Sequence, residues 1–577
     1  MTGFMMGRKR KNRDNTVDRQ NHNSIEDPLT IKSSWFGDQI HWVSRHYGSD
    51  ETSIFKHSCA YYYYDGSGGH ETMPLNNKSY ATSASPNNDN DELNISAKCN
   101  KTCSGINATY EELPSTHTSL SSELNQLKQQ LMPAAQSCAD AINNFDNTNN
   151  NRKATTPQYE FRQARSICNP YESMGDILIR PHRYNKSKRH NRRNGKSSSF
   201  QFVNRSAIKL ANIDALLGFA LTNSSTTKAK ANDEKFFAFV DLCGAPGGFS
   251  EYILYRHMNP LRSTVHVVAD TQSSSATTAS DNTKGNDNAT SCFGFGMSLL
   301  GKNNEGKGAR WDLNHLRKHY NLQSNNELGA KKDSTTTSQP PAGYKSNNKS
   351  KQLLHYHVCR GIDGTGTIYN WDNVIELQRQ ISMHLSGKNN ECDESSINAS
   401  NGTPNEHHRV HLVVADGGFD AQRDSDNQEV LAHHIVVSQT AAALSLLRKG
   451  GIYIVKMFGF HEVSTMRMLS YLYGCFDKMT FMKPTSSRPA SAERYLICSG
   501  YSGVGSEWDG LAWKQQQMDI ISEGHPNNYD CTPLANLAAK FDLDVLKLNV
   551  ESCRSIVDYL NKKRDGLMKE EETSIDC

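Results

Sequence analysis

Asp416 and Lys456 lie at positions of predicted strands from which a side chain can take part in acid–base chemistry. Asp416 follows the apolar run Val410–Ala415 and precedes two glycines. Doubly wound folds place their chemistry at the carboxyl ends of strands, although an aspartate there can also simply cap the next turn. Lys456 interrupts the apolar run Gly451–Phe458. A buried lysine is costly unless it is paired or functional, so an edge-strand lysine facing water is the weaker interpretation.

Two further polar residues become candidates for chemistry only in combination with Asp416 and Lys456. Lys209 lies between Ile208 and Leu210 in a segment with helical spacing, and Glu493 directly precedes the strand-like run Arg494–Cys498. Alone, the first is an ordinary helical lysine and the second a polar turn residue. With Asp416 and Lys456 they form a Lys-Asp-Lys-Glu series in chain order.

A glycine-rich turn suggests what these side chains work with. Residues 239–252 read FVDLCGAPGGFSEY, so an apolar strand enters a turn of small residues and leaves as a helix. Glycines let a ligand approach the backbone closely. The turn is neither GxGxxG nor a phosphate-binding loop, which disfavours a nucleoside triphosphate. S-adenosylmethionine fits better, since its methionine tail can bond to backbone amides; a tight turn without a ligand is the alternative.

The elements that must position these residues alternate along the chain, as in a parallel sheet flanked by helices. The strands are predicted at Phe236–Leu242, at Ser263–Ala269 or Cys292–Ser298, and at His355–Cys359, Val410–Ala415 and Gly451–Phe458. The helices are predicted at Tyr159–Glu172, Phe202–Leu217, Phe249–Arg256, Trp371–Leu385, Asp426–Leu447 and His461–Phe476. Lys478–Lys483 and Arg494–Tyr501 are expected to pair as an antiparallel hairpin at one edge of the sheet.

Composition limits how much of the chain belongs to this core. Only 36% of the 577 residues are hydrophobic and the mean hydropathy is -0.69, which predicts one large folded domain with long polar insertions. We expect a mostly disordered region 1–155 with a short helix at Ser119–Leu131, a catalytic domain 156–502 and a helical extension 503–577. A core without residues 1–150 and without the insert 323–351 should stay soluble and active. The disordered inserts are placed at about 177–199, 271–291, 301–310, 323–351 and 387–408.

Charge and cysteine content narrow the class of protein. The net charge of +3 does not indicate a class of binding partner. Residues 7–13 and 180–196 are basic runs, which could bind RNA phosphates, act as a nuclear import signal, or simply form a solvated arm. The fourteen cysteines lack metal-site spacing, so no metal site is predicted. No apolar stretch is long enough to cross a bilayer. We expect a soluble protein of a reducing compartment.

The four polar residues and the turn resemble the Lys-Asp-Lys-Glu tetrad and cofactor turn of FtsJ-like RNA ribose 2′-O-methyltransferases. Further stretches are similar to the cap-specific mRNA nucleoside 2′-O-methyltransferases of cap-1 type, and the match covers roughly residues 157–502 without the inserts. They are 164–165, 169–172, 204–205, 248–252, 294–297, 361–364, 415–419, 487–490 and 493–495. The resemblance implies a Rossmann-like S-adenosylmethionine-dependent α/β fold, with a mostly parallel sheet and an antiparallel edge hairpin.

The resemblance also assigns roles to residues. Lys209, Asp416, Lys456 and Glu493 would be catalytic. The cofactor would be held by Asn204, Cys243, Gly244, Ala245, Pro246, Gly247, Gly248, Phe249, Asp363, Thr367 and Ile368. The capped RNA would lie along Arg165, Gln428 and Ser491. The family often has an acid where this chain has Thr367 and Ile368, which leaves the adenosine contact open between Asp363 and Thr367. Burial beside Lys209 is expected to lower the pKa of Lys456, so that it can take the ribose proton.

The function that this resemblance implies is conversion of cap 0 to cap 1, the methylation of the first transcribed nucleotide of 5′-capped mRNA. The same chemistry on cap position two, rRNA or tRNA, and a non-catalytic RNA-binding protein on the same fold, are the alternatives. The expected partners are capped mRNA and the transcription or capping machinery, with no membrane. The expected location is the nucleus, with the cytoplasm as the alternative.

Overall fold

The computed structural model describes residues 34–36, 40–44, 63–64, 70–71, 115–146, 154–169, 171–172, 178–179, 201–222, 236–259, 291–299, 310–320, 322–324, 354–386, 408–418, 427–503 and 531–575. The predicted inserts lie almost wholly outside these residues. No helix among the described residues is both long and apolar enough to cross a membrane.

A nine-stranded sheet forms the centre of the molecule, in the order β1-β10-β11-β9-β8-β4-β5-β7-β6. Its strands are β1 (Val43–Ser44), β4 (Phe236–Leu242), β5 (Ser291–Met297), β6 (Gln323–Ser324), β7 (Leu354–Cys359), β8 (Val410–Ala415), β9 (Leu447–Met457), β10 (Phe476–Met482) and β11 (Arg494–Tyr501). All neighbours from β6 to β9 are parallel, whereas β11 is antiparallel to β9 and to β10. A separate two-stranded ladder pairs β2 (Tyr63–Tyr64) with β3 (His70–Glu71). The predicted mixed α/β sheet is therefore confirmed.

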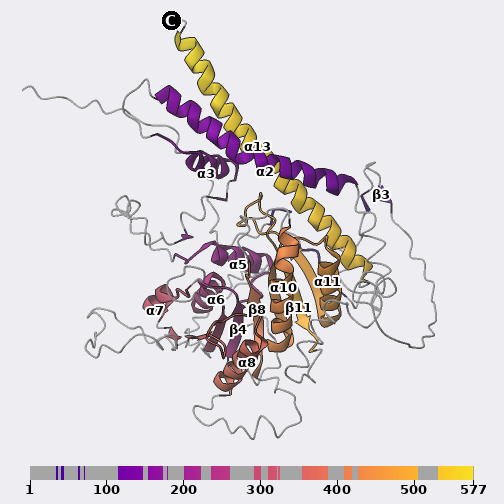
Figure 1. The fold of residues 1–577 in the computed structure, drawn as a ribbon. Coiled ribbons are helices and arrows are strands. Elements are labelled where there is room, and N and C mark those ends of the chain that lie inside the picture. The colour runs from indigo at the N-terminus through magenta and orange to yellow at the C-terminus, as the bar shows by residue number, and fades with distance from the viewer. Residues whose placement is uncertain are drawn as a thin grey trace, which may run out of the picture.

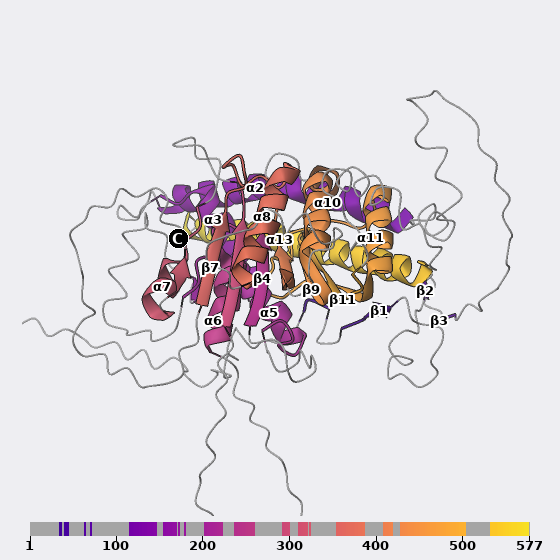
Figure 2. The same cartoon turned by 90° about the horizontal axis from the view of Figure 1, so that it is seen from below.

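Helices cover both faces of the sheet (Figure 2). One face carries α8 (Trp371–Leu385), α10 (Gln428–Leu446) and α11 (Val463–Cys475), and the other carries α5 (Arg205–Leu216), α6 (Gly248–Met258) and α7 (Asn314–Tyr320). Each face has its own apolar cluster, and both clusters reach every central strand of the sheet. Burial on both faces explains why the central strands are continuous apolar runs in the sequence.

A group of three helices lies beside the sheet (Figure 1). α2 (Ser115–Asp146) and α13 (Thr532–Ile575) run side by side, and α3 (Pro157–Cys168) packs against both of them. Leu124 and Leu127 of α2 meet Leu546 and Val550 of α13 in a small apolar core. Two regions that are far apart in the sequence thus form one packing unit.

Several predicted boundaries shift for physical reasons. The helix expected at Ser119–Leu131 extends over 32 residues, because α13 covers its apolar face. α5 begins only at Arg205, since the Asn204 side chain caps it by accepting a hydrogen bond from the Ser206 amide at 3.1 Å. Of the two strands proposed after α6, β5 forms at Ser291–Met297, while residues 263–269 lie outside the described residues. The predicted hairpin β10–β11 forms, but β1 pairs beyond β10 and takes the edge position.

Candidate active site

The site begins where the strand order reverses. β4 lies between β5 and β8, and in open α/β sheets ligands bind beyond the carboxyl ends of the strands at this point. The glycine-rich turn follows β4 and Asp416 follows β8. The Asp416 amide donates to the carbonyl of Leu242 at 3.3 Å, which holds the two strand ends together.

Lys456 and Asp416 meet at this edge from the neighbouring strands β9 and β8. The Lys456 Nζ atom donates to the main-chain oxygen of Asp416 at 2.8 Å and lies 3.2 Å from its Oδ1 atom. Gly418 keeps the approach open, because a Cβ atom there would stand 3.0 Å from Nζ. The predicted pair is therefore in contact.

The pKa of Lys456 differs from the sequence-based expectation. Burial alone would lower it, but the carboxylates of Asp416 and Glu493 outweigh burial and raise the pKa above its ordinary value. The expectation of a lowered pKa is wrong, because Lys209 is neutralised by its own partner. Lys456 is thus a cation at neutral pH in the free protein.

That partner of Lys209 is Glu493. The Lys209 Nζ atom is 2.7 Å from both carboxylate oxygens of Glu493, and the side chains are only 15% and 14% exposed. Burial would raise the pKa of Glu493, but the charges of Lys209 and Lys456 lower it to about 2. The four predicted catalytic side chains therefore lie together as two ion pairs that face one another.

Two residues that the sequence analysis missed connect these pairs. The Ser206 hydroxyl donates to Asp416 Oδ2 at 2.6 Å, and the Tyr495 hydroxyl lies 3.3 Å from both Asp416 Oδ1 and Glu493 Oε1. The positions of Ser206 and Tyr495 relative to the two lysines could have indicated that both belong to the site. Ser206 precedes Lys209 by three residues on one helix, and Tyr495 is the register partner of Lys456 across β11 and β9.

A third lysine supports the loop that carries Glu493. Lys483 is fully buried, and its Nζ atom donates to the main-chain oxygens of Ser491 at 2.6 Å and Glu493 at 2.7 Å. Burial is the main cause that lowers the pKa of Lys483 to about 7. In the sequence, Lys483 is recognisable only as the last residue of a predicted strand. Its contacts fix the backbone on either side of the catalytic glutamate.

A cavity of about 450 Å³ opens in front of the ion pairs. Lys456 and Glu493 line it, as do two of the predicted RNA contacts, Gln428 and Ser491. Its opposite wall is formed by α2, through Ser121, Asn125 and Lys128, and by α13, through Leu546 and Asn549. Residues outside the predicted catalytic domain thus complete the cleft.

The third predicted RNA contact, Arg165, does not line this cavity. It pairs with Glu172 at 3.1 Å, and Arg205 and Arg488 pair with the same carboxylate at 3.2 and 3.3 Å. Three guanidinium groups around one glutamate leave a net positive cluster. Burial would raise the pKa of Glu172, but the charges of the three arginines together outweigh burial and lower the pKa.

The glycine-rich turn has a packing reason for its glycines. A Cβ atom at Gly244 would stand 1.9 Å from Asp241 Oδ1, one at Gly248 would stand 2.1 Å from Asn204 Oδ1, and one at Gly247 would meet the Trp311 ring at 2.9 Å. Gly247 also has a φ of +101°. Neighbouring side chains of the protein therefore leave no room for a Cβ atom at Gly244, Gly247 and Gly248, whether or not a ligand is bound. Cys243, Ala245 and Pro246 are partly exposed at the rim, and Phe249 is buried against Tyr495.

The second predicted cofactor segment follows β7. Asp363 is exposed, and its carboxylate accepts hydrogen bonds from the Thr365 amide and hydroxyl and from Asn370. These hydrogen bonds lower its pKa, the one from Asn370 most. Thr367 is bonded within the loop and Ile368 is packed in the core. Of the two adenosine contacts left open, Asp363 is the one that presents a polar group to solvent.

These observations fit an S-adenosylmethionine-type ligand. The αL backbone at Gly247 begins α6 without a side-chain cap, which presents the helix N-terminus toward the site. Asp363 can accept hydrogen bonds from hydroxyl groups, since an ionised carboxylate has more acceptor positions than its loop uses. The residues that would hold the ligand come from the turn, the N-cap of α5 and the loop after β7.

The comparisons with known proteins agree with this geometry. Residues 202–288 and 360–501 match the profile of the FtsJ-like methyltransferase family. A relative from Drosophila melanogaster, named cap-specific mRNA (nucleoside-2′-O-)-methyltransferase 1, is 26% identical over 61% of this chain and 30% of its own length. The protein of the same name from Mus musculus is 26% identical over 59% and 28%. The chain thus spans less than a third of the length of these relatives.

A solved structure described as a putative ribosomal RNA methyltransferase from Plasmodium falciparum aligns with 52% of this chain and 97% of its own. Its TM-score is 0.25 and its sequence identity 15%. A score this low says nothing further about the fold.

Proposed function

We propose that the protein methylates the ribose 2′-hydroxyl of the first transcribed nucleotide of 5′-capped mRNA, converting cap 0 to cap 1. The proposal starts from the match of residues 202–288 and 360–501 to the FtsJ-like methyltransferase family. Two buried ion pairs carry the proposal, Lys209–Glu493 and Lys456–Asp416. Glu493 of the first and Lys456 of the second line one cleft. The names of the relatives support the capped substrate.

The methyl donor in this proposal is S-adenosylmethionine, which supplies a methyl group already activated by the sulfonium. Asn204, the turn 243–248 and Asp363 would hold it. The difficult part is then the nucleophile, because a ribose hydroxyl has a high pKa and must be aligned with the methyl group while it loses its proton.

The side chains of the cleft are suited to that task. In its neutral form Lys456 accepts the proton of the 2′-oxygen on Nζ, and Asp416 holds Nζ at the mouth of the sheet. Ser206 and Tyr495 fix the Asp416 carboxylate. The Lys209–Glu493 pair, anchored through Tyr495 and the loop that Lys483 braces, presents hydrogen-bonding groups to the ribose.

The cleft also offers contacts for the RNA around the ribose. Gln428 and Ser491 lie on its catalytic side, and Asn125 and Lys128 lie on the α2 side. Amide, hydroxyl and ammonium groups suit phosphates and sugar hydroxyls. The cluster of Arg165, Arg205 and Arg488 is a further region of positive charge, formed in part by residues next to the cleft.

The test is methyl transfer from labelled S-adenosylmethionine to short RNAs that differ only at the 5′ end. One carries an N7-methylated guanosine cap, one an unmethylated cap and one a triphosphate. We expect transfer to capped RNA, with the label at the 2′-oxygen of the first nucleotide after nuclease digestion. Label on the second nucleotide, or transfer to uncapped rRNA or tRNA fragments only, would assign the same chemistry to another RNA.

A non-catalytic role would appear as RNA binding without transfer to any of these RNAs. The intact tetrad argues against that alternative. Nuclear localisation and an association with the transcription or capping machinery remain predictions, because residues 7–13 and 180–196 lie outside the described residues.

A further inference from the structure

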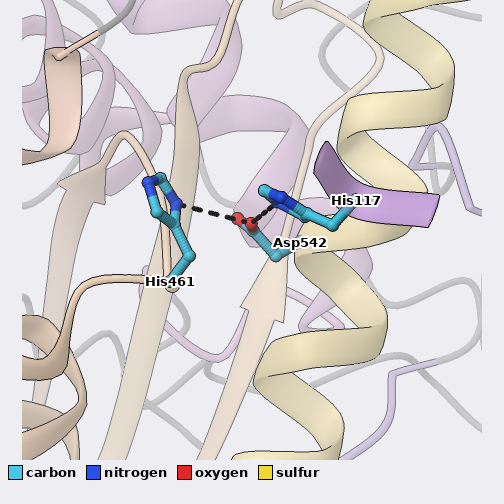
Figure 3. Close-up of side chains that lie close together, drawn as sticks. All are labelled: His117, His461 and Asp542. Atoms are coloured by element: carbon cyan, nitrogen blue, oxygen red, sulfur yellow. Dashed lines mark hydrogen bonds and ion pairs between the residues drawn. The ribbon is translucent and has the colours of Figure 1, made fainter. Parts of the chain in front are cut away.

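Two histidines and an aspartate from three distant segments meet at the wall of the cleft (Figure 3). His117 belongs to the first turn of α2, His461 to the loop between β9 and α11, and Asp542 to α13. One ligand atom from each lies within 4.8 Å of the others. His117 and Asp542 are 425 residues apart, which explains why the spacing of the sequence indicated no metal site.

The distances resemble the edges of a metal coordination shell. The His117 Nε2 atom is 3.2 Å and the His461 Nδ1 atom 3.7 Å from the same oxygen, Asp542 Oδ2. Ligand atoms about 2.0–2.1 Å from a tetrahedral zinc ion are about 3.3–3.4 Å apart. A second carboxylate is close, because Glu429 Oε2 lies 2.7 Å from His461 Nδ1. Two imidazole nitrogens with one carboxylate oxygen favour zinc-class ions over Mg²⁺ or Ca²⁺.

The surroundings orient these donors as the outer shell of a metal site does. The other oxygen of Asp542, Oδ1, is taken by Arg494 and by the Phe460 amide, so Oδ2 is left for the histidines. The His461 Nε2 atom lies 3.7 Å from a carboxylate oxygen of Glu462. The Nδ1 atom is buried, and no hydrogen bond of normal geometry satisfies it despite the nearby carboxylate.

We propose that His117, His461 and Asp542 bind one zinc-class divalent ion, through Nε2, Nδ1 and Oδ2 respectively, with Glu429 as a second carboxylate beside His461. The two carboxylates balance the charge of the ion, and Asp542 and Glu429 are only 6% and 5% exposed. The ion joins the start of α2 to the β9–α11 loop and to α13. It therefore holds the α2 wall against the catalytic side of the cleft, a role that does not depend on which RNA is methylated.

The experiment measures zinc affinity of the full chain after removal of metal with a chelator. Zinc is then titrated at pH 7.5 in competition with a chromophoric chelator, for the parent, His117→Ala and His461→Ala. His434→Ala is the matched control, since it removes an exposed histidine that stacks on Tyr369 outside the cluster. We expect the parent and the control to bind one zinc ion that both cluster variants bind at least about tenfold more weakly.

A second measurement needs no variant. Hydrogen exchange of the metal-free parent with and without zinc should show added protection at the start of α2, around His461 and around Asp542 together. Equal zinc binding by parent and cluster variants, or no protection at these three segments, would overturn the proposal. The cluster would then be an ion-pair network only, with His461 protonated between Asp542 and Glu429.

Discussion

Lys456 contacts the carboxylate of Asp416 at the end of the neighbouring strand β8, and this contact sets how the reaction should depend on pH. Because the carboxylates of Asp416 and Glu493 raise its pKa, only a small fraction of Lys456 is neutral at pH 7. If the neutral form takes the proton, kcat should rise about tenfold per pH unit between about pH 6 and 9. Rates at saturating substrates across this range test it. A flat profile would leave Lys456 only an orienting role.

Removing the amine at this position gives the matching mutational prediction. Lys456→Met keeps the length of the side chain, and kcat should fall by about 10²–10⁴-fold while the affinity for S-adenosylmethionine stays within a few fold. Lys449→Met, an exposed lysine on the same strand, is the control. Single-turnover methylation and calorimetric titration of the cofactor separate the two effects. Activity close to that of the parent would contradict the assignment.

Glu493 should contribute stability that disappears in acid. Its folded pKa of about 2 lies below the unfolded value of 4.5, so its contribution is complete above pH 4.5 and is lost as the pH falls toward 2. The shift corresponds to roughly 3 kcal/mol. Urea unfolding should therefore show Glu493→Gln less stable than the parent at pH 6, with a gap that narrows below pH 4.5. A gap independent of pH would show that the ion pair is not its source.

At the scale of single residues, the sequence predicted which side chains meet but not their electrostatics. Asp416 and Lys456 were predictable because parallel strands end at one edge of the sheet. The direction of the Lys456 pKa shift was not, since it depends on which lysine faces which carboxylate. Glu429, His117 and Asp542 could not be grouped from spacing, because three separate elements bring them together.

At the scale of elements, the strands and helices of the sheet were largely predictable and the α2–α13 pair was not. Apolar runs and alternation identify a strand from local sequence alone. The apolar face of α2 has its partner more than 400 residues away (Glu123 pairs with Arg554, 431 residues on), so its length and packing are not visible locally. The glycine-rich turn lies at the carboxyl end of β4, as predicted, but its glycines also accommodate Asp241, Asn204 and Trp311.

The α2 face that lines the cleft should contribute to RNA binding and not to cofactor binding. Lys128→Ala should weaken binding of capped RNA and reduce the slope of log K against log salt by about 0.7, the change expected for one lost phosphate contact on a single strand. Lys562→Ala, an exposed lysine of α13 outside the cavity lining, should leave the slope unchanged. Fluorescence anisotropy at several salt concentrations measures it. An unchanged slope in Lys128→Ala would mean that α2 only closes the cleft.

At the scale of the whole molecule, the described residues 34–36, 40–44 and 115–146 are part of the packed structure, and α2 among them lines the site. Trp35 donates its indole N–H to the carbonyl of Ser487 at 2.9 Å and packs edge-on against Tyr171. Its amide also bonds to the carbonyl of Lys483 at 3.1 Å, next to the loop that carries Glu493. α2 then covers α13 and forms the far wall of the cleft.

Deleting residues 1–146 should therefore abolish methylation of capped RNA, contrary to the sequence-based expectation that a core without residues 1–150 stays active. The deletion uncovers the apolar side chains Leu546, Val550, Ile556 and Leu560 of α13, and an exposed patch of this kind promotes self-association. The cofactor residues lie on the remaining sheet, so S-adenosylmethionine binding should be retained. Deletion of residues 2–33 is the control and should keep full activity. We test both truncations by size-exclusion chromatography, cofactor titration and methyl transfer. A monomeric and fully active protein without residues 1–146 would contradict the prediction, because the sheet domain would then carry the whole site by itself.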